Sequence, residues 1–279
     1  MSQNVILDNH FHLNYSNDFL LAAKIFEKAG GTAINLTNLP QFVDLNEDYY
    51  DNVYQRTMRM AGKIKEMCSV DVLLTIGPYP LDILNVKSEK ADRKEFIKNG
   101  IDLAIKYIEN GRANALGEIG RIHFPGHENL NAELNEILQY AMDSCRDVKC
   151  PIILHTEDLD EGSIKQLDAM ARGANLEKNK VIKHHGLPQN LSVNSDLIFS
   201  IPATRGNIKE VMKQEKPFFL ETDYIDDPMD KNRYLPADSV PRRYKTIIQE
   251  YGKTRDALIR KVFNELPRKV YGDHAFRSD

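Results

Sequence analysis

Short apolar runs alternate with amphipathic stretches along almost the whole chain. The apolar runs predict strands at residues 5–7, 33–36, 70–76, 113–116, 152–154, 181–183, 197–200 and 218–220. Apolar residues at helical spacing predict helices between them, at residues 18–29, 50–67, 94–109, 130–148, 163–172 and 206–214. Strands that alternate with helices favour a parallel sheet, and eight such units without a long linker favour a closed (β/α)8 TIM barrel of the α/β class.

The chain is interpreted as one domain. Its 279 residues fit a single α/β barrel, and no internal repeat or low-complexity stretch divides them. Two further helical stretches, at residues 242–251 and 254–266, follow the last predicted strand. We therefore expect residues 1–279 to form one barrel domain, with C-terminal helices at about 242–266 packing on it.

Composition narrows the function classes. Lys and Arg number 37 against 41 Asp and Glu, for a net charge of −4, which argues against a strongly basic nucleic-acid coat. The three cysteines form no C-x-x-C pair, which argues against a disulfide framework. The first residues lack a signal-peptide pattern, and no apolar run reaches the roughly 18 residues of a membrane span. We expect a cytoplasmic protein with no membrane association and no obligate protein partner.

Side chains of the kind that bind metals fall near the ends of the predicted strands. His10 and His12 are two positions apart, so a strand turns both to one side. The others follow the fourth, fifth, sixth and eighth predicted strands and are Glu118, His155, His184 and Asp223. The carboxyl ends of barrel strands meet at one face, where barrel enzymes have their active sites. These six side chains are therefore predicted to converge.

Imidazole and carboxylate groups bind divalent cations such as Zn²⁺ or Mn²⁺. Four histidines and two carboxylates are too many ligands for one tetrahedral ion, but they suit two ions bridged by a carboxylate. Two ions of this kind stabilise attacking and leaving oxygens and lower the pKa of a bound water. The sequence thus predicts two divalent metal ions per chain, of Zn, Mn, Mg, Ni or Fe.

Three motifs carry a resemblance to a known family. Residues 8–12, Asp-Asn-His-Phe-His, resemble the D-x-H-x-H signature of the amidohydrolase superfamily. With Gly117-Glu118-Ile119-Gly120 and Glu221-Thr222-Asp223, the chain is similar to TatD-type metal-dependent hydrolases, which are TIM barrels with a two-metal site. The resemblance implies that Glu118 bridges two ions and that Asp223 accepts the proton of the attacking water. By the same likeness, one ion is held by His10, His12 and Asp223, and the other by His155 and His184.

The chain departs from this family's pattern at two places. TatD-type enzymes usually continue the GEIG motif with an apolar residue and then Asp, whereas this chain has Arg121 and Ile122. They usually have a basic residue two positions after the fifth-strand histidine, where this chain has Glu157. A carboxylate there repels a phosphodiester unless a metal ion or Arg121 neutralises it.

Several other residues are candidates for supporting roles. Candidate contacts to an anion or to the substrate are Arg121, His123 and Arg205. Glu157 and His185 are further candidate substrate contacts. Only one of His184 and His185 can face the metal ions, because neighbouring residues of a strand point to opposite sides. We favour His184 as the ligand. Asp8 is predicted to orient a histidine rather than to bind metal.

The leading functional hypothesis is hydrolysis of phosphodiester bonds, which the resemblance to TatD-type deoxyribonucleases implies. The alternative is an amidohydrolase-type enzyme that cleaves an amide, lactone or phosphate ester in a small molecule; the net charge and Glu157 favour it. The predicted partner is accordingly a nucleic acid or a small-molecule substrate. A third hypothesis is a non-catalytic metal-binding protein, against which the candidate base Asp223 argues.

Overall fold

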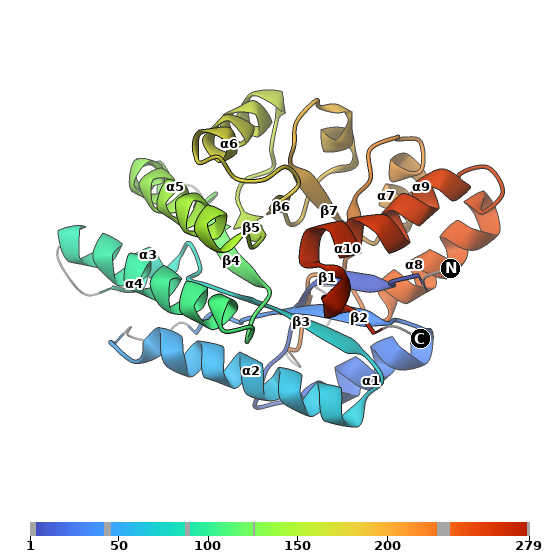
Figure 1. The fold of residues 1–279 in the computed structure, drawn as a ribbon, viewed down its shortest axis with the longest axis horizontal. Coiled ribbons are helices and arrows are strands. Elements are labelled where there is room, and N and C mark those ends of the chain that lie inside the picture. The colour runs from blue at the N-terminus through green and yellow to red at the C-terminus, as the bar shows by residue number, and fades with distance from the viewer. Residues whose placement is uncertain (1–3, 42–45, 87–89, 125, 228–234, 278–279) are drawn as a thin grey trace.

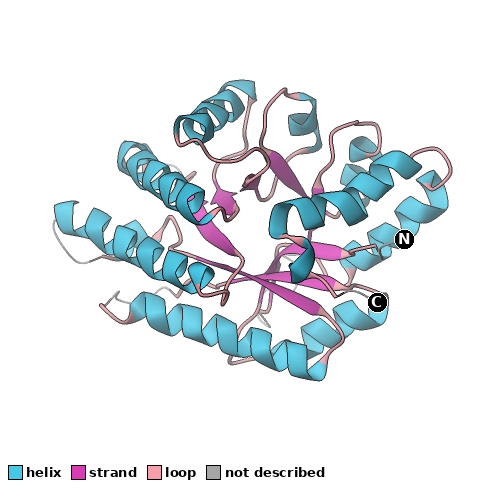
Figure 2. Ribbon diagram, in the orientation of Figure 1, coloured by secondary structure: helices cyan, strands magenta, loops and turns pink. Residues whose placement is uncertain are grey.

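Eight parallel strands close into a barrel in the computed structural model, which describes residues 4–41, 46–86, 90–124, 126–227 and 235–277. Neighbouring strands pair from β2 through β8 to β1, and β1 pairs with β2 to close the ring (Figure 2). The two-residue strand β9 (Tyr224–Ile225) adds to β1. The eight strands are β1 (Leu7–His12), β2 (Ala33–Thr37), β3 (Asp71–Ile76), β4 (Ala115–Gly120), β5 (Ile152–His155), β6 (Val181–Lys183), β7 (Ile198–Pro202) and β8 (Phe219–Glu221). The predicted (β/α)8 TIM barrel is confirmed.

Helices surround the barrel (Figure 1). The connection from β6 to β7, described in full, holds the 3-10 helix η2 (Pro188–Ser192) and no α-helix. The others are α1 (Phe19–Ala29), α2 (Tyr49–Met67), α3 (Asp82–Asn85), α4 (Lys90–Glu109), η1 (Glu128–Leu130), α5 (Asn131–Val148), α6 (Glu161–Gly173), α7 (Arg205–Val211), α8 (Ser239–Tyr251), α9 (Asp256–Arg260), the π-helical η3 (Lys261–Glu265), α10 (Leu266–Tyr271) and η4 (Asp273–Ala275). The C-terminal helices thus begin at Ser239, before the predicted residue 242, and continue past 266 to Tyr271.

Two predicted strands have the wrong bounds. The first was expected at residues 5–7 but runs over Leu7–His12, and the fourth was expected at 113–116 but runs over Ala115–Gly120. Both continue through polar residues that are buried in the barrel, including Asn9 and Glu118. Because strand prediction follows apolar runs, it ended both strands where these buried polar residues begin. Glu118 therefore lies within β4 rather than after it.

The barrel interior is apolar at the amino-terminal ends of the strands, where the helix α10 closes it. Leu7, Leu73, Ile153 and Phe219 belong to a cluster that also includes Leu266, Val270 and Tyr271 of α10. The Tyr271 hydroxyl donates to Asn9 Oδ1 at 2.7 Å and accepts from Asn35 Nδ2 at 3.2 Å. This apolar cluster thus ends in a layer of polar groups, which includes Asn9, the residue before His10 in β1.

Register shifts in two strands change which side chains point into the barrel. The pairing of β1 with β2 shifts between Asp8 and Phe11, and that of β4 with β5 shifts between Leu116 and Ile119. Before the first shift, Leu7 belongs to the inner cluster; after it, Phe11 belongs to the outer core. A bulge of this kind re-aims the side chains that follow it. Both shifts lie beside candidate metal ligands, His10 in β1 and Glu118 in β4.

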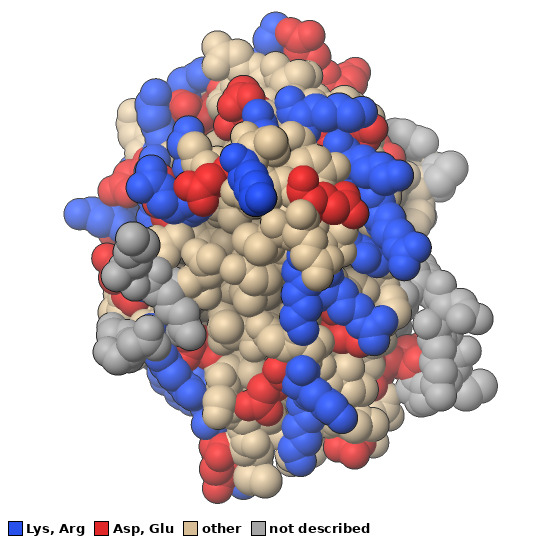
Figure 3. Space-filling view, turned by 90° about the vertical axis from the view of Figure 1, so that its right-hand side faces the viewer, with Lys and Arg blue, Asp and Glu red and all other residues tan. Residues whose placement is uncertain are grey.

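Charged groups are mixed on the side of the molecule that carries the two termini. Figure 3 shows basic and acidic side chains interspersed there around a central area without charged groups. Arg242 of α8 pairs with Asp238 at 2.6 Å, and Arg255 pairs with Glu215 at 2.7 Å. Among the described residues, no helix has the length and apolar character that a membrane crossing requires.

Candidate metal centre

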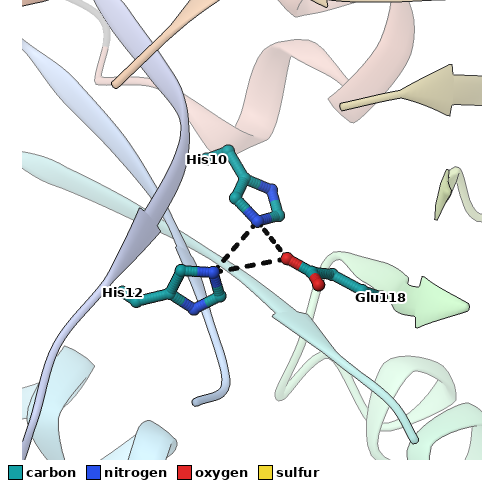
Figure 4. A group of neighbouring side chains, drawn as sticks. All are labelled: His10, His12 and Glu118. Carbon is teal, nitrogen blue, oxygen red and sulfur yellow. Dashed lines mark hydrogen bonds and ion pairs between the residues drawn. The ribbon is translucent and has the colours of Figure 1, made fainter. Parts of the chain in front are cut away.

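The first group of candidate ligands comes from β1 and β4. The Nε2 atoms of His10 and His12 lie 3.1 Å apart, and His12 Nε2 lies 3.3 Å from Glu118 Oε1. The same carboxylate oxygen contacts His10 Nε2, so the three atoms form a triangle (Figure 4). All three side chains are buried. Three atoms with lone pairs thus face one point inside the barrel.

The second group shares the same glutamate. His155 Nδ1 lies 2.8 Å from His184 Nε2 and 3.3 Å from the other carboxylate oxygen, Glu118 Oε2. The rings of His10 and His184 stack with their centroids 4.1 Å apart, which sets the two groups side by side. Glu118 Oε2 therefore faces His155, whereas Oε1 faces His10 and His12 and lies 4.0 Å from His184 Nε2.

Asp223 faces the first group from above β8. Its amide donates to the carbonyl of His10 at 3.1 Å, and its φ of 50° is in the left-handed region. Its Oδ1 lies 3.6 Å from His12 Nε2 and 3.9 Å from His10 Nε2. The side chain is 23% exposed, against 5% for Glu118. Asp223 is thus the more accessible of the two carboxylates.

Hydrogen bonds behind the first group orient its ligands. The carbonyl of Thr37 lies 3.1 Å from His12 Nδ1, so Nδ1 carries the proton and Nε2 keeps its lone pair. Asp8 is buried, and its Oδ1 accepts from the amides of His10 at 3.4 Å and Thr222 at 3.0 Å. Asp8 therefore contacts the main chain of His10 rather than its ring.

Burial and charge set the protonation of the centre in opposite directions. Burial disfavours the charged form of His10, but the carboxylates of Glu118, Asp223 and Glu221 together outweigh this effect and raise the pKa of His10 to about 9. Burial opposes ionisation of Glu118, but the charge on His10 holds the pKa of Glu118 well below its usual range. Burial and the neighbouring His10 lower the pKa of His184. The carboxylates around His10 thus favour a positive charge at this position, whether it is a proton or a metal ion.

The donor atoms fit divalent ions. Ligand atoms about 2.0–2.2 Å from an ion lie roughly 3–3.5 Å from one another. His12 Nε2 and His155 Nδ1 each lie 3.3 Å from a Glu118 oxygen, which is within this range. The buried Nδ1 atoms of His10 and His184 have no hydrogen bond among the described residues. Three groups can hold an ion: His10, His12 and Glu118; His10, His184 and Asp223; and Glu118, His155 and His184. The six predicted residues thus come together in space.

Arg121 lies beside this centre but is held by other side chains. Its guanidinium is buried and donates to Asn135 at 2.8 Å, to Glu157 at 3.0 Å and to Gln166 at 3.0 Å. Arg121 therefore pairs with Glu157, the acidic residue two positions after His155. This pairing offsets the charge of Glu157, whose side chain is 34% exposed.

The remaining candidates lie at different depths. The ring of His123 is exposed and lies 5.1 Å from that of His155, at the rim of the centre. His184 is turned inward, whereas His185 is exposed with a φ of 51°. Arg205 is exposed at the start of α7, and the structure does not bring it to the candidate ligands.

Sequence reasoning missed three residues that contact the centre. The Tyr79 hydroxyl lies 3.2 Å from His155 Nε2. Lys183 is buried and donates to the carbonyls of Thr156 at 3.1 Å and His184 at 2.6 Å, which ties together the ends of β5 and β6. Glu221 is fully buried, and burial raises its pKa to about 8. Lys183 and Glu221 each end a strand, a position that would have indicated both, whereas Tyr79 lies in the turn after β3.

Known proteins resemble this chain over nearly its whole length. A family model described as TatD related DNase matches residues 7–272. An uncharacterized protein of Methanocaldococcus jannaschii, MJ1127, is 30% identical over 270 residues, which cover 95% of each chain.

Solved structures share the fold. The TatD-like protein of Archaeoglobus fulgidus has a TM-score of 0.67 at 14% identity, covering 95% of this chain and 99% of its own. The TatD homolog YJJV of Escherichia coli K12 has a TM-score of 0.64 at 15% identity, covering 95% of this chain and 97% of its own. At these identities the likeness shows a common barrel.

Proposed function

The chain belongs to the TatD related DNase family, and on that premise we propose that it hydrolyses phosphodiester bonds with two divalent metal ions bound around Glu118. Membership confirms the resemblance that the motifs indicated, and the family is one of metal-dependent hydrolases. The bond that is cleaved and the number of ions are the parts that we propose.

One observation supports two ions above all others. Glu118 presents Oε1 to His10 and His12 and Oε2 to His155. A carboxylate that served a single ion would not need histidines at both of its oxygens. We assign His10, His12 and Asp223 to one ion and His155 and His184 to the other. The four imidazoles favour Zn, Fe or Ni over Mg.

Each residue then has a chemical task. Divalent ions bound here supply the positive charge that acidifies water and neutralises a phosphoryl oxygen. Asp223, the more exposed carboxylate, accepts the proton of the attacking water. Buried Glu118 keeps its charge next to His10 and fixes the separation of the two ligand groups. Thr37 and Asp8 hold the first strand in place behind them.

A small-molecule substrate is the second candidate. Glu157 lies close to the centre and is partly exposed, and an acidic rim disfavours a polyanion. The pair with Arg121 reduces this repulsion, which supports the phosphodiester as the first choice. A purely metal-binding role is the least supported, because it gives no reason for the accessible carboxylate of Asp223.

Metal analysis and a substrate panel test the proposal. Purified protein should contain up to two equivalents of a transition metal, and it should shorten labelled single-stranded DNA in a metal-dependent way. DNA that stays intact while a panel of esters, lactones and amides is cleaved would select the small-molecule alternative. A chain that binds no divalent ion would exclude both enzymatic hypotheses.

A further inference from the structure

A tyrosine contacts one of the second-group histidines from outside the set of candidate ligands. Tyr79 lies in the turn after β3, and its hydroxyl oxygen is 3.2 Å from His155 Nε2. The two rings meet edge to face, with centroids 5.0 Å apart and planes at 69°. The other ring nitrogen, Nδ1, is the one that faces His184 and Glu118. Tyr79 therefore touches His155 on the side opposite to the metal centre.

This placement has a consequence for the tautomer of His155. A neutral imidazole carries one proton, and the nitrogen without it provides the lone pair that binds a metal. If Nε2 carries the proton and donates it to the Tyr79 hydroxyl oxygen, Nδ1 is left bare toward Glu118. We propose that Tyr79 is a positioning residue, which fixes the tautomer and ring orientation of His155 for the second ion. This inference rests on the proposed two-ion function.

The turn that carries Tyr79 is itself held firmly. The buried carboxylate of Asp82 accepts from the Tyr79 amide at 3.0 Å and from the Tyr50 hydroxyl at 3.2 Å. The Gly77 amide donates to Asn38 Oδ1 at 2.9 Å. A Cβ on Gly77 would lie 2.9 Å from the amide nitrogen of Gly117, so the turn is packed against the strand that carries Glu118.

The contact completes a pattern within the centre. His12 of the first group has its Nδ1 fixed by the Thr37 carbonyl. His184 lacks such a support in the described part of the chain, because its Nδ1 is 3.7 Å from Glu221 Oε1 and forms no hydrogen bond. Among the described residues, the outer ring nitrogen of His155 therefore has a partner in Tyr79, whereas that of His184 has no hydrogen bond. Partners of this kind typically change metal affinity by about 10- to 100-fold.

Titration of metal-free protein with Zn²⁺ alone tests the assignment. Tyr79→Phe keeps the ring and removes the hydroxyl, and it should weaken the second binding event at least about 10-fold while leaving the first unchanged. Tyr140→Phe is the matched control, since that hydroxyl bonds to Asp102 at 2.6 Å on the exposed surface of α5. The control should bind both ions as the wild type does. Equal affinities in wild type and Tyr79→Phe would overturn the inference.

Nitrogen NMR of the histidine rings provides a second readout that needs no bound metal and no activity. In metal-free wild type, His155 should carry its proton on Nε2, and in Tyr79→Phe the other tautomer should become populated. A proton on Nδ1 in the wild type would overturn the inference even if the variant fails to fold. Wild type that takes up a single ion would contradict the two-ion proposal, and the tautomer would still decide the role of Tyr79.

Discussion

Asp8 in the first strand and Thr222 after the last strand of the barrel are joined by two hydrogen bonds. Asp8 Oδ2 accepts from Thr222 Oγ1 at 2.7 Å, and Oδ1 accepts from the Thr222 amide at 3.0 Å. Asp8 is two residues before His10, and Thr222 immediately precedes Asp223. Because the pair is buried, it fixes the separation of His10 and Asp223, two candidate ligands that come from opposite ends of the chain.

Thr222→Val should weaken binding at the first group. The substitution keeps the shape but removes the donor to Asp8, which costs about 1–2 kcal/mol when a buried carboxylate loses a partner. Zinc titration and urea unfolding of the metal-free protein would measure the two effects. Thr246→Val, which removes a hydroxyl bond on the exposed side of α8, is the control. A Thr222→Val protein with wild-type affinity would show that the pair does not position the ligands.

Glu118→Gln should reduce the metal content from two ions to at most one. An amide has a single oxygen with lone pairs and no negative charge, so it cannot serve both groups of histidines. Elemental analysis after removal of loosely bound ions gives the stoichiometry. Retention of both ions by the variant would rule out the bridging role.

Asp223→Asn should lower hydrolysis at least about 100-fold, because general-base catalysis contributes this much or more. The side chain lies at the partly exposed edge of the centre, so the second group should still bind its ion. Turnover of whichever substrate the panel identifies, together with metal content, separates loss of the base from loss of metal. A rate equal to that of the wild type would remove the assigned role.

Arg121→Met should destabilise the protein by about 3 kcal/mol, because a buried cation leaves three polar side chains without their donor. Those partners belong to α5, to the segment after β5 and to α6. Urea unfolding would measure the loss. Arg146→Met is the control: its ion pairs are on the surface, and it should cost less than about 1 kcal/mol. Similar losses in both variants would contradict the structural role of Arg121.

Asp82→Asn should remove part of the pH dependence of stability. Burial raises the pKa of Asp82 to about 7 from a model-compound value of 3.8. Between pH 4 and 7 the unfolded chain therefore releases this proton while the folded chain retains it, so the free energy of unfolding falls as pH rises. The loss reaches up to about 4 kcal/mol and then levels off. Asparagine keeps an oxygen for Tyr79 and Tyr50 and does not titrate.

Urea unfolding of the metal-free proteins at pH 5 and pH 8 tests this prediction. The wild type should lose more stability between the two pH values than Asp82→Asn does. Other titrating groups are common to both proteins and cancel in the comparison. Parallel pH profiles would show that Asp82 titrates alike in the folded and unfolded chain.

The alternation of apolar runs with amphipathic stretches was sufficient to predict the barrel, because each βα unit buries its own strand. Because active sites of barrels lie at the carboxyl ends of the strands, the sequence also predicted that His155 and His184 lie at the same face of the barrel. It could not foresee the register shifts that turn His10 and Glu118 inward, since these depend on pairing between strands. Tyr79 was treated as part of a turn, because nothing local to it reveals that His155, 76 residues later, lies beside its hydroxyl.

The metal centre exists only when the first strand meets the last. Asp8 pairs with Leu220 across the closing seam, and His10 and Asp223 join the centre from either side of it. All four histidines precede Asp223 in the chain, so a polypeptide still being synthesised carries them before Asp223 is added. Fragments that end before the eighth strand therefore cannot assemble the complete set of candidate ligands.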